Sequence, residues 1–121
     1  MSKAQEFSRP MIVALNAVAD ECWQNAEDHG FHKDGSNNTP ATWVANLHGE
    51  ISEFWEAYRK GKLDEPCDKP IPLTCAEEEL ADEIIRCLDV ARQKGLDIGR
   101  ALAIKHQYNL ARPYLHGDKL A

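Results

Sequence analysis

Hydrophobic residues recur every three or four positions in four stretches of this chain, and no stretch shows the alternation of apolar and polar residues typical of a half-buried strand. The first stretch opens after Ser8, a residue type that caps helix N-termini, and ends at Gly30. The second begins at Thr39 and Pro40 and ends at Gly61. Both stretches are therefore predicted to be α-helices.

The third and fourth stretches carry boundary signals of the same kind. Thr74 and Glu77 form the pattern of a capping box, and Gly95 follows the last apolar position of the third stretch. Asp97 suits the N-cap of a fourth helix, which Pro113 brings to an end. The chain is thus predicted to form four helices.

The segments between these helices favour turns and irregular structure. Residues 30–38 are rich in Gly, Asn, Asp and Ser, and residues 61–73 contain three prolines. The polar tail, residues 116–121, is expected to be loosely held. A length of 121 residues with 43% hydrophobic and 28% charged residues is typical of one globular domain. We therefore expect a single all-α domain over residues 1–121, arranged as a four-helix bundle.

Composition narrows the classes of partner. A formal net charge of −6 argues against binding nucleic acid along a basic surface. No apolar run is long enough to cross a membrane, and the first residues do not resemble a signal peptide. The four cysteines show no C-x-x-C pairing, so reduced thiols are expected. These features predict a cytoplasmic protein with no nucleic-acid or membrane partner.

Two acidic pairs are the most informative chemical feature. Glu50 and Glu53 lie in the second predicted helix, and Glu79 and Asp82 lie in the third. Residues three apart share one face of a helix, so two neighbouring helices would bring four carboxylates to one groove. Such a set of oxygen ligands suits Mg²⁺, with Mn²⁺ as a possible substitute.

Two alternatives apply to these acids. Acidic residues three apart often form only a solvated helix face, but Glu50 lies about 20° from Trp43 around the helix and so borders the apolar stripe. A di-iron bundle would need Glu-x-x-His motifs, and the sequence contains none. Arg86 is expected to form an ion pair within the groove, because carboxylates without a nearby cation are costly to bury, and contact with a substrate is the alternative role.

These residues resemble the MazG-like all-α nucleoside triphosphate pyrophosphohydrolases, whose signature is E-x-x-E followed by E-x-x-D. The matching segments here read LHGEISEFWEAYRKG and EEELADEIIRCLDVA. Residues 105–119 are similar to the K-x-x-x-N-x-x-R-P ending of small phage and bacterial members. The resemblance is strongest over residues 40–119, although the proline-rich connector is longer than in the commonest pattern.

The resemblance implies Mg²⁺-dependent cleavage of a nucleoside triphosphate between its α- and β-phosphates, giving a monophosphate and pyrophosphate, a housekeeping role in the nucleotide pool. The metal ligands would be Glu50, Glu53, Glu79 and Asp82. Glu53 is the expected general base, while the other carboxylates stay open as candidates. Lys105, Asn109 and Arg112 would bind the phosphates.

The sequence also suggests how the base is bound and how chains associate. The aromatic residues available to stack on a base are Trp23, Phe31, Trp43, Phe54 and Trp55. The second helix presents a broad apolar arc, which favours self-association, and the family resemblance implies a homodimer or homotetramer. Two further hypotheses stand beside the enzyme: a non-catalytic helical module that binds a metal or nucleotide, and a metal-dependent phosphoesterase acting on another pyrophosphate linkage.

Overall fold

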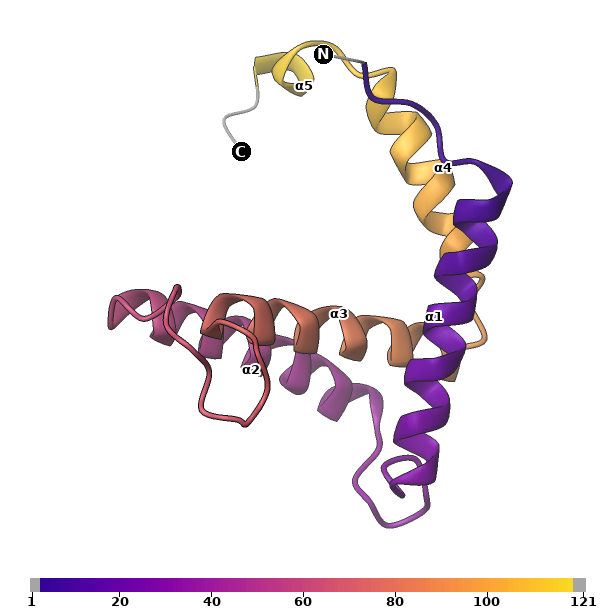
Figure 1. Cartoon of the computed structure of the whole chain (residues 1–121). Coiled ribbons are helices and arrows are strands. Elements are labelled where there is room, and N and C mark those ends of the chain that lie inside the picture. The colour runs from indigo at the N-terminus through magenta and orange to yellow at the C-terminus, as the bar shows by residue number, and fades with distance from the viewer. Residues whose placement is uncertain (1–2, 119–121) are drawn as a thin grey trace.

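A computed structural model describes residues 3–118 and consists of helices joined by loops (Figure 1). The helices are α1 (Arg9–Asp28), α2 (Pro40–Arg59), α3 (Cys75–Gln93), α4 (Ile98–Leu110) and the single turn α5 (Leu115–Asp118). Within residues 3–118 the only β-type pairing is one isolated bridge between Pro66 and Thr74. The predicted all-α fold is confirmed for this part of the chain.

The predicted helix starts are confirmed by capping contacts. The hydroxyl groups of Ser8 and Thr39 accept hydrogen bonds from backbone N–H groups in the first turns of α1 and α2. Thr74 and Glu77 form the expected capping box, in which Glu77 Oε1 accepts from the Thr74 N–H at 2.9 Å. Asp97 caps α4. The polar tail differs from the expectation in part, because residues 115–118 form the short helix α5, while residues 119–121 lie outside the described part of the chain.

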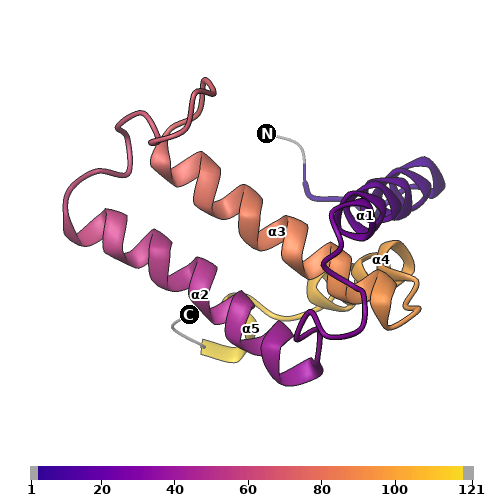
Figure 2. The same cartoon turned by 90° about the horizontal axis from the view of Figure 1, so that it is seen from below.

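The helices form two arms that meet at a corner (Figures 1 and 2). The first arm is an antiparallel hairpin of α2 and α3, which pack along their length. The second arm is α1 with α4 beside it, and α1 crosses the end of α3. Within the described residues the backbone of α2 makes no close contact with α1 or α4, so α2 joins the packed helices through α3.

Alanine, leucine and glycine residues allow close packing at the corner. Ala19, Leu88 and Ala91 are buried where α1 crosses α3. Gly99 brings the start of α4 against α1 so closely that an added Cβ atom would collide with the carbonyl oxygen of Ile12. Asn16 fixes this contact, since its Oδ1 accepts from the Gly99 N–H at 2.8 Å and its Nδ2 donates to Asp97 at 2.8 Å.

The apolar arc predicted for α2 is largely uncovered in a single chain. Val44, Ile51, Trp55 and Tyr58 are each more than half exposed, and Ile84 of α3 is exposed to a similar degree. Among the described residues no helix is both long and apolar enough to cross a membrane. The hairpin therefore presents an apolar surface that the chain itself does not bury.

Candidate metal centre and adjoining cavity

Three of the four predicted ligand carboxylates meet between α2 and α3. Glu50, Glu53 and Glu79 each offer an oxygen atom, and these atoms lie within 4.8 Å of one another. Helical spacing puts Glu50 and Glu53 on one face of α2, and the packing of the hairpin brings that face to Glu79. Glu50 is only 7% exposed and so does not belong to a solvated helix face, whereas Glu53 is exposed and Glu79 is intermediate.

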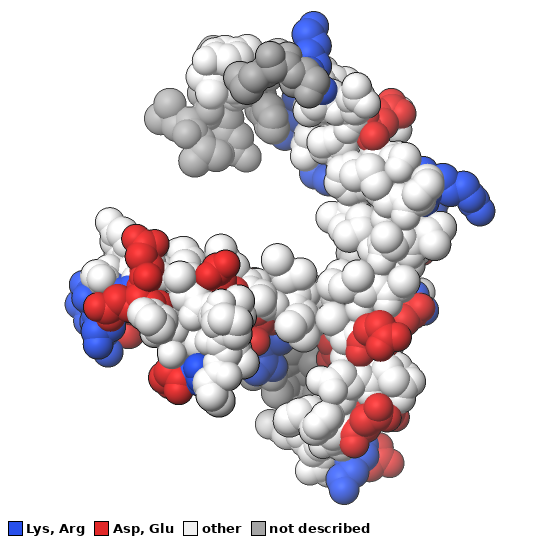
Figure 3. Space-filling model, viewed as in Figure 1, with Lys and Arg blue, Asp and Glu red and all other residues white. Residues whose placement is uncertain are grey.

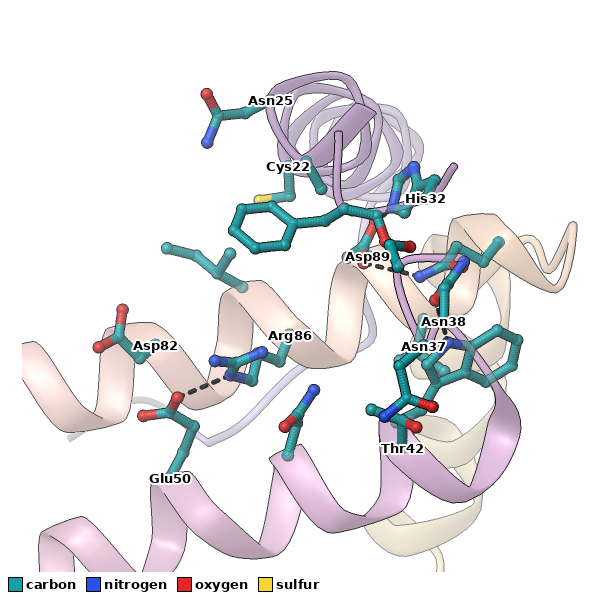
Figure 4. A pocket seen from close by; sticks show the side chains of 18 residues that line it. Cys22, Asn25, His32, Asn37, Asn38, Thr42, Glu50, Asp82, Arg86 and Asp89 are labelled. Carbon is teal, nitrogen blue, oxygen red and sulfur yellow. Dashed lines mark hydrogen bonds and ion pairs between the residues drawn. The ribbon is translucent and has the colours of Figure 1, made fainter. Parts of the chain in front are cut away.

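Asp82, the fourth predicted ligand, lies beside this cluster and not within it. It is one turn beyond Glu79 on α3 and lines a cavity together with Glu50 and Arg86 (Figure 4). Burial raises the pKa of Asp82, and the charge of Glu78 adds to this, while Lys69 and Arg86 act in the opposite direction. Asp82 thus feels the charges around the cluster, but its oxygen atoms are not among the clustered ones.

The three clustered carboxylates repel one another. Burial raises the pKa of Glu79 to about 7, reinforced by its contact with Glu53 and by the charges of Glu53, Glu78 and Glu50. A carboxyl group with such neighbours holds a proton near neutral pH unless another cation replaces it. The raised pKa therefore marks a place where positive charge is needed.

Arg86 supplies part of that charge, as the sequence predicts. Its Nε donates to Glu50 Oε1 at 2.6 Å (Figure 4). Glu50 Oε2 and Glu79 Oε2 are both buried and have no hydrogen-bond partner. Buried carboxylate oxygens without a hydrogen-bond partner destabilise the folded state, and such oxygens bind hard divalent cations well. The donor set therefore fits Mg²⁺ or Mn²⁺.

Sequence reasoning missed one carboxylate next to this cluster. Glu78 is 6% exposed and forms an ion pair with Lys69 of the proline-rich connector. The acidic run Glu77, Glu78 and Glu79 could have pointed to Glu78. A capping role for Glu77 and a ligand role for Glu79 left Glu78 without an assigned role. Its burial depends on where the connector folds, which no local pattern specifies.

A cavity of about 310 Å³ opens beside Glu50, Asp82 and Arg86, between the end of α1, the 29–39 loop, α2 and α3 (Figure 4). Its walls combine apolar and polar side chains, and amide side chains are the most frequent polar ones. Side-chain amides join α2, the loop and α3: Trp43 Nε1 donates to Asn38 at 2.6 Å, Asn38 donates to Gln93 at 2.7 Å, and Gln93 donates to Asp89 at 2.8 Å. This network holds the long loop against the hairpin.

His32 ends the network deep in the cavity wall. Its side chain is 8% exposed, and its Nε2 lies 2.8 Å from Asp89 Oδ1. Its Nδ1 lies 3.3 Å from Glu27, and its ring packs on Trp23. Sequence reasoning missed both His32 and Asp89. The loop of His32 has no periodic pattern that could have identified it. Asp89 had a signal, because it lies three residues after Arg86 and shares its face of α3.

Two of the five aromatic residues proposed for base stacking line the cavity. These are Phe31, which is 68% exposed, and Trp43. Trp23 instead packs on His32, and Trp55 stacks on Tyr58 on the exposed face of α2. The cavity therefore has one exposed aromatic side chain at the loop and one on α2 that is held by its hydrogen bond to Asn38.

The predicted phosphate-binding residues lie on the other arm. Lys105 and Asn109 are in α4 and Arg112 follows it, and α4 contacts α1 and α3 but not α2. Lys105 and Arg112 both lie over the ring of Tyr108, at 4.8 and 5.7 Å from its centre. On the face shown in Figure 3 the charged side chains around α4 are mostly basic, acidic and basic ones lie together over the hairpin, and acidic ones follow the lower half of α1. A single chain does not bring these residues to the carboxylates.

Comparisons with protein-family models, with curated proteins and with solved structures find no match to this chain. The chemistry of the site therefore follows from its own residues. A cluster of carboxylates with two unpaired buried oxygens suits a divalent cation, and a cavity beside it with both apolar and amide walls suits a small organic ligand. Together they define a candidate metal and small-molecule site on the α2–α3 hairpin.

Proposed function

We propose that this protein is a Mg²⁺-dependent nucleoside triphosphate pyrophosphohydrolase of the MazG-like kind, acting in the cytoplasm on free nucleotides. The observation that carries the proposal is the carboxylate cluster of Glu50, Glu53 and Glu79, which has two unpaired buried oxygens and whose member Glu50 lines a cavity of about 310 Å³. A cavity of that size suits a ligand as large as a nucleoside. A triphosphate attached to this nucleoside would extend over the carboxylates.

The chain's own residues divide into ligands and positioning groups. Glu50, Glu53, Glu79 and Asp82 would hold Mg²⁺, with Mn²⁺ as a substitute. When bound, the ion neutralises the phosphates and lowers the pKa of a bound water molecule. Arg86 holds Glu50 through Oε1, which leaves Oε2 available. Glu53 is the most exposed member of the cluster and is placed to accept a proton from an attacking water.

The cavity would hold the nucleoside. Phe31 of the loop and Trp43 of α2 both line the cavity and offer aromatic rings for stacking. The side-chain amides of Asn37 and Asn46 line the same cavity. Amide groups both donate and accept hydrogen bonds, as the edges of nucleobases do. The network from Trp43 to Asp89 fixes the loop in place, so the binding surface is largely formed before the ligand enters.

A second copy of the chain would complete the site. Lys105, Asn109 and Arg112 are the phosphate-binding residues that the resemblance implies, and they lie away from the carboxylates of their own chain. The exposed apolar face of α2 is suited to burial in a homodimer or homotetramer. In this assembly α4 of one chain approaches the hairpin of another.

The proposal is tested by product analysis. Purified protein is incubated with common and modified nucleoside triphosphates, with and without Mg²⁺, and nucleotides and pyrophosphate are measured separately. We expect monophosphate and equimolar pyrophosphate, and only when metal is present. Release of orthophosphate would favour a phosphoesterase of another type. Thermal stabilisation by Mg²⁺ without cleavage of any nucleotide would identify the non-catalytic binding module.

A further inference from the structure

The proline-rich connector between α2 and α3 is a folded loop with defined hydrogen bonds. Cys67 is buried, and its N–H donates to the Leu73 carbonyl at 2.9 Å. The Cys75 N–H donates to the Glu65 carbonyl at 2.8 Å, which closes the base of the loop. These contacts place Lys69 near the tip of the loop, in a defined position beside the start of α3.

Lys69 contacts a carboxylate that adjoins the metal-ligand set. Its ammonium group pairs with Glu78 and lies 3.3 Å from Asp68. The two ends of the main ion pair are unequal, because the Glu78 side chain is 8% exposed whereas the Lys69 side chain is 59% exposed. Glu78 precedes Glu79 in the sequence and lies one turn before Asp82 on α3, so Lys69 stands at the edge of the carboxylate cluster.

The order of groups along α3 gives the site a direction. Asp89 lies in the wall of the cavity, Arg86 and Asp82 lie where the cavity meets the carboxylates, and Glu79 and Glu78 follow toward the start of the helix. The 29–39 loop and the connector lie at opposite ends of the hairpin (Figure 2). A ligand with its nucleoside in the cavity would therefore point its phosphate chain toward the connector.

We propose that Lys69 binds the terminal phosphates of the substrate, the half of the molecule that leaves as pyrophosphate. This inference rests on the proposed function. Lysine is a compact charge on a flexible stem, and the exposed stem of Lys69 allows the ammonium to turn from Glu78 to a phosphate oxygen. Arg86 and Lys69 then bracket the carboxylates, one on the side of the cavity and one on the side of the connector.

A purely structural role for Lys69 is the competing explanation, since removing it leaves Glu78 buried without its partner. A double substitution separates the two roles. Glu78→Gln removes the buried charge and keeps the shape of the side chain. If Lys69 only neutralises Glu78, Lys69→Ala combined with Glu78→Gln regains normal ligand binding. If Lys69 contacts phosphate, the combined variant regains thermal stability but not pyrophosphate affinity.

The test is calorimetric titration of inorganic pyrophosphate, in the presence of Mg²⁺, into the full-length protein and its variants. We expect Lys69→Ala to weaken binding by roughly tenfold or more, the effect of losing one charged hydrogen bond, and Lys69→Arg to weaken it much less. Lys62→Ala, an exposed lysine at the start of the same connector, is the matched control and is expected to bind normally. Binding of a nucleoside monophosphate should be unchanged in all variants.

Three results would overturn the assignment of Lys69: no pyrophosphate binding by the wild-type protein, equal binding by Lys69→Ala, or full recovery in the double variant. These results are separate from the test of the proposed function. A protein that hydrolyses triphosphates while Lys69→Ala binds pyrophosphate normally would contradict only the role of Lys69. A protein that binds pyrophosphate through Lys69 but cleaves no nucleotide would contradict only the enzymatic proposal.

Discussion

The α2–α3 hairpin and the α1–α4 arm differ in what they bury where two helices meet. The hairpin buries the charged side chains of Glu50 and Glu78, each held by one cation. In the other arm α4 meets α1 at Gly99, whose missing side chain allows contact between the two backbones. Close backbone packing stabilises a fold at little cost, whereas buried carboxylates destabilise it unless a ligand uses them. The contrast agrees with the proposed ligand site in the hairpin, whereas the contact at Gly99 is explained by packing alone.

The largest expected effect that tests this contrast is loss of activity in the hairpin. Glu53→Gln keeps the shape of the side chain and removes its charge, so turnover should fall by at least about 100-fold while the fold is retained. Glu56→Gln is the matched control, because Glu56 lies one turn further along α2 and pairs with Arg59 on the surface. Steady-state kinetics and thermal melts measure both effects. Normal turnover by Glu53→Gln would contradict the assignment of Glu53 to the active site.

The second effect is on stability and belongs to the α1–α4 arm. Gly99→Ala places a methyl group against the Ile12 carbonyl and should destabilise the fold by about 1–3 kcal/mol. Gly49→Ala is the control: nothing lies within 4 Å of an added Cβ there, and alanine favours the helix. Urea unfolding measures both. If Gly99→Ala leaves stability unchanged, the account of the corner is wrong.

The third prediction tests whether α4 of one chain and the hairpin of another form one shared site. Arg112→Ala should weaken apparent triphosphate affinity by roughly tenfold, because one charged hydrogen-bond donor is lost. If the site is shared, mixing this variant with Glu53→Gln should restore turnover above the mean of the separate proteins, since mixed assemblies contain intact sites. Turnover that does not rise on mixing, in samples shown to exchange subunits, would place Arg112 outside a shared site.

The smallest expected effect is a pH dependence of the hairpin. The pKa of Glu79 is about 7 in the folded chain and 4.5 as its ordinary value, so the folded state holds this proton more tightly. Its contribution to the stability of the metal-free protein is therefore present below about pH 4.5 and is lost as pH rises through about 7. Stabilisation by Mg²⁺ should grow over the same range, because the ion replaces the proton.

Melting temperatures with EDTA and with Mg²⁺, between about pH 5.5 and about pH 8, measure this effect. Glu79→Gln provides the control, because it has no carboxyl group to titrate and should give a flatter profile. Metal-free stability that rises across this range, with Glu79→Gln unchanged from the wild type, would contradict the assignment.

The helix boundaries and the shared face of Glu50 and Glu53 were predictable because both depend on short-range patterns, whereas the contact of Glu79 with them depends on the packing of α2 against α3. Thr74 and Glu77 contact one another within one turn, and Glu50 and Glu53 share a face through helical spacing alone. The burial of Glu78 and the pairing of His32 with Asp89 were not predictable, because each joins a helix to an irregular loop. The direction of α4 depends on how Asn16 holds Gly99, a contact between distant parts of the sequence.

The central claim is that Glu50, Glu53 and Glu79 form a divalent metal site. Electron paramagnetic resonance of Mn²⁺ added to the metal-free protein tests it most directly, because free and bound Mn²⁺ give different signals. The account predicts saturable binding that Mg²⁺ displaces and that Glu53→Gln or Glu79→Gln weakens strongly, while Glu56→Gln leaves it unchanged. Binding that is absent from the wild-type protein, or equal in all four proteins, would contradict it.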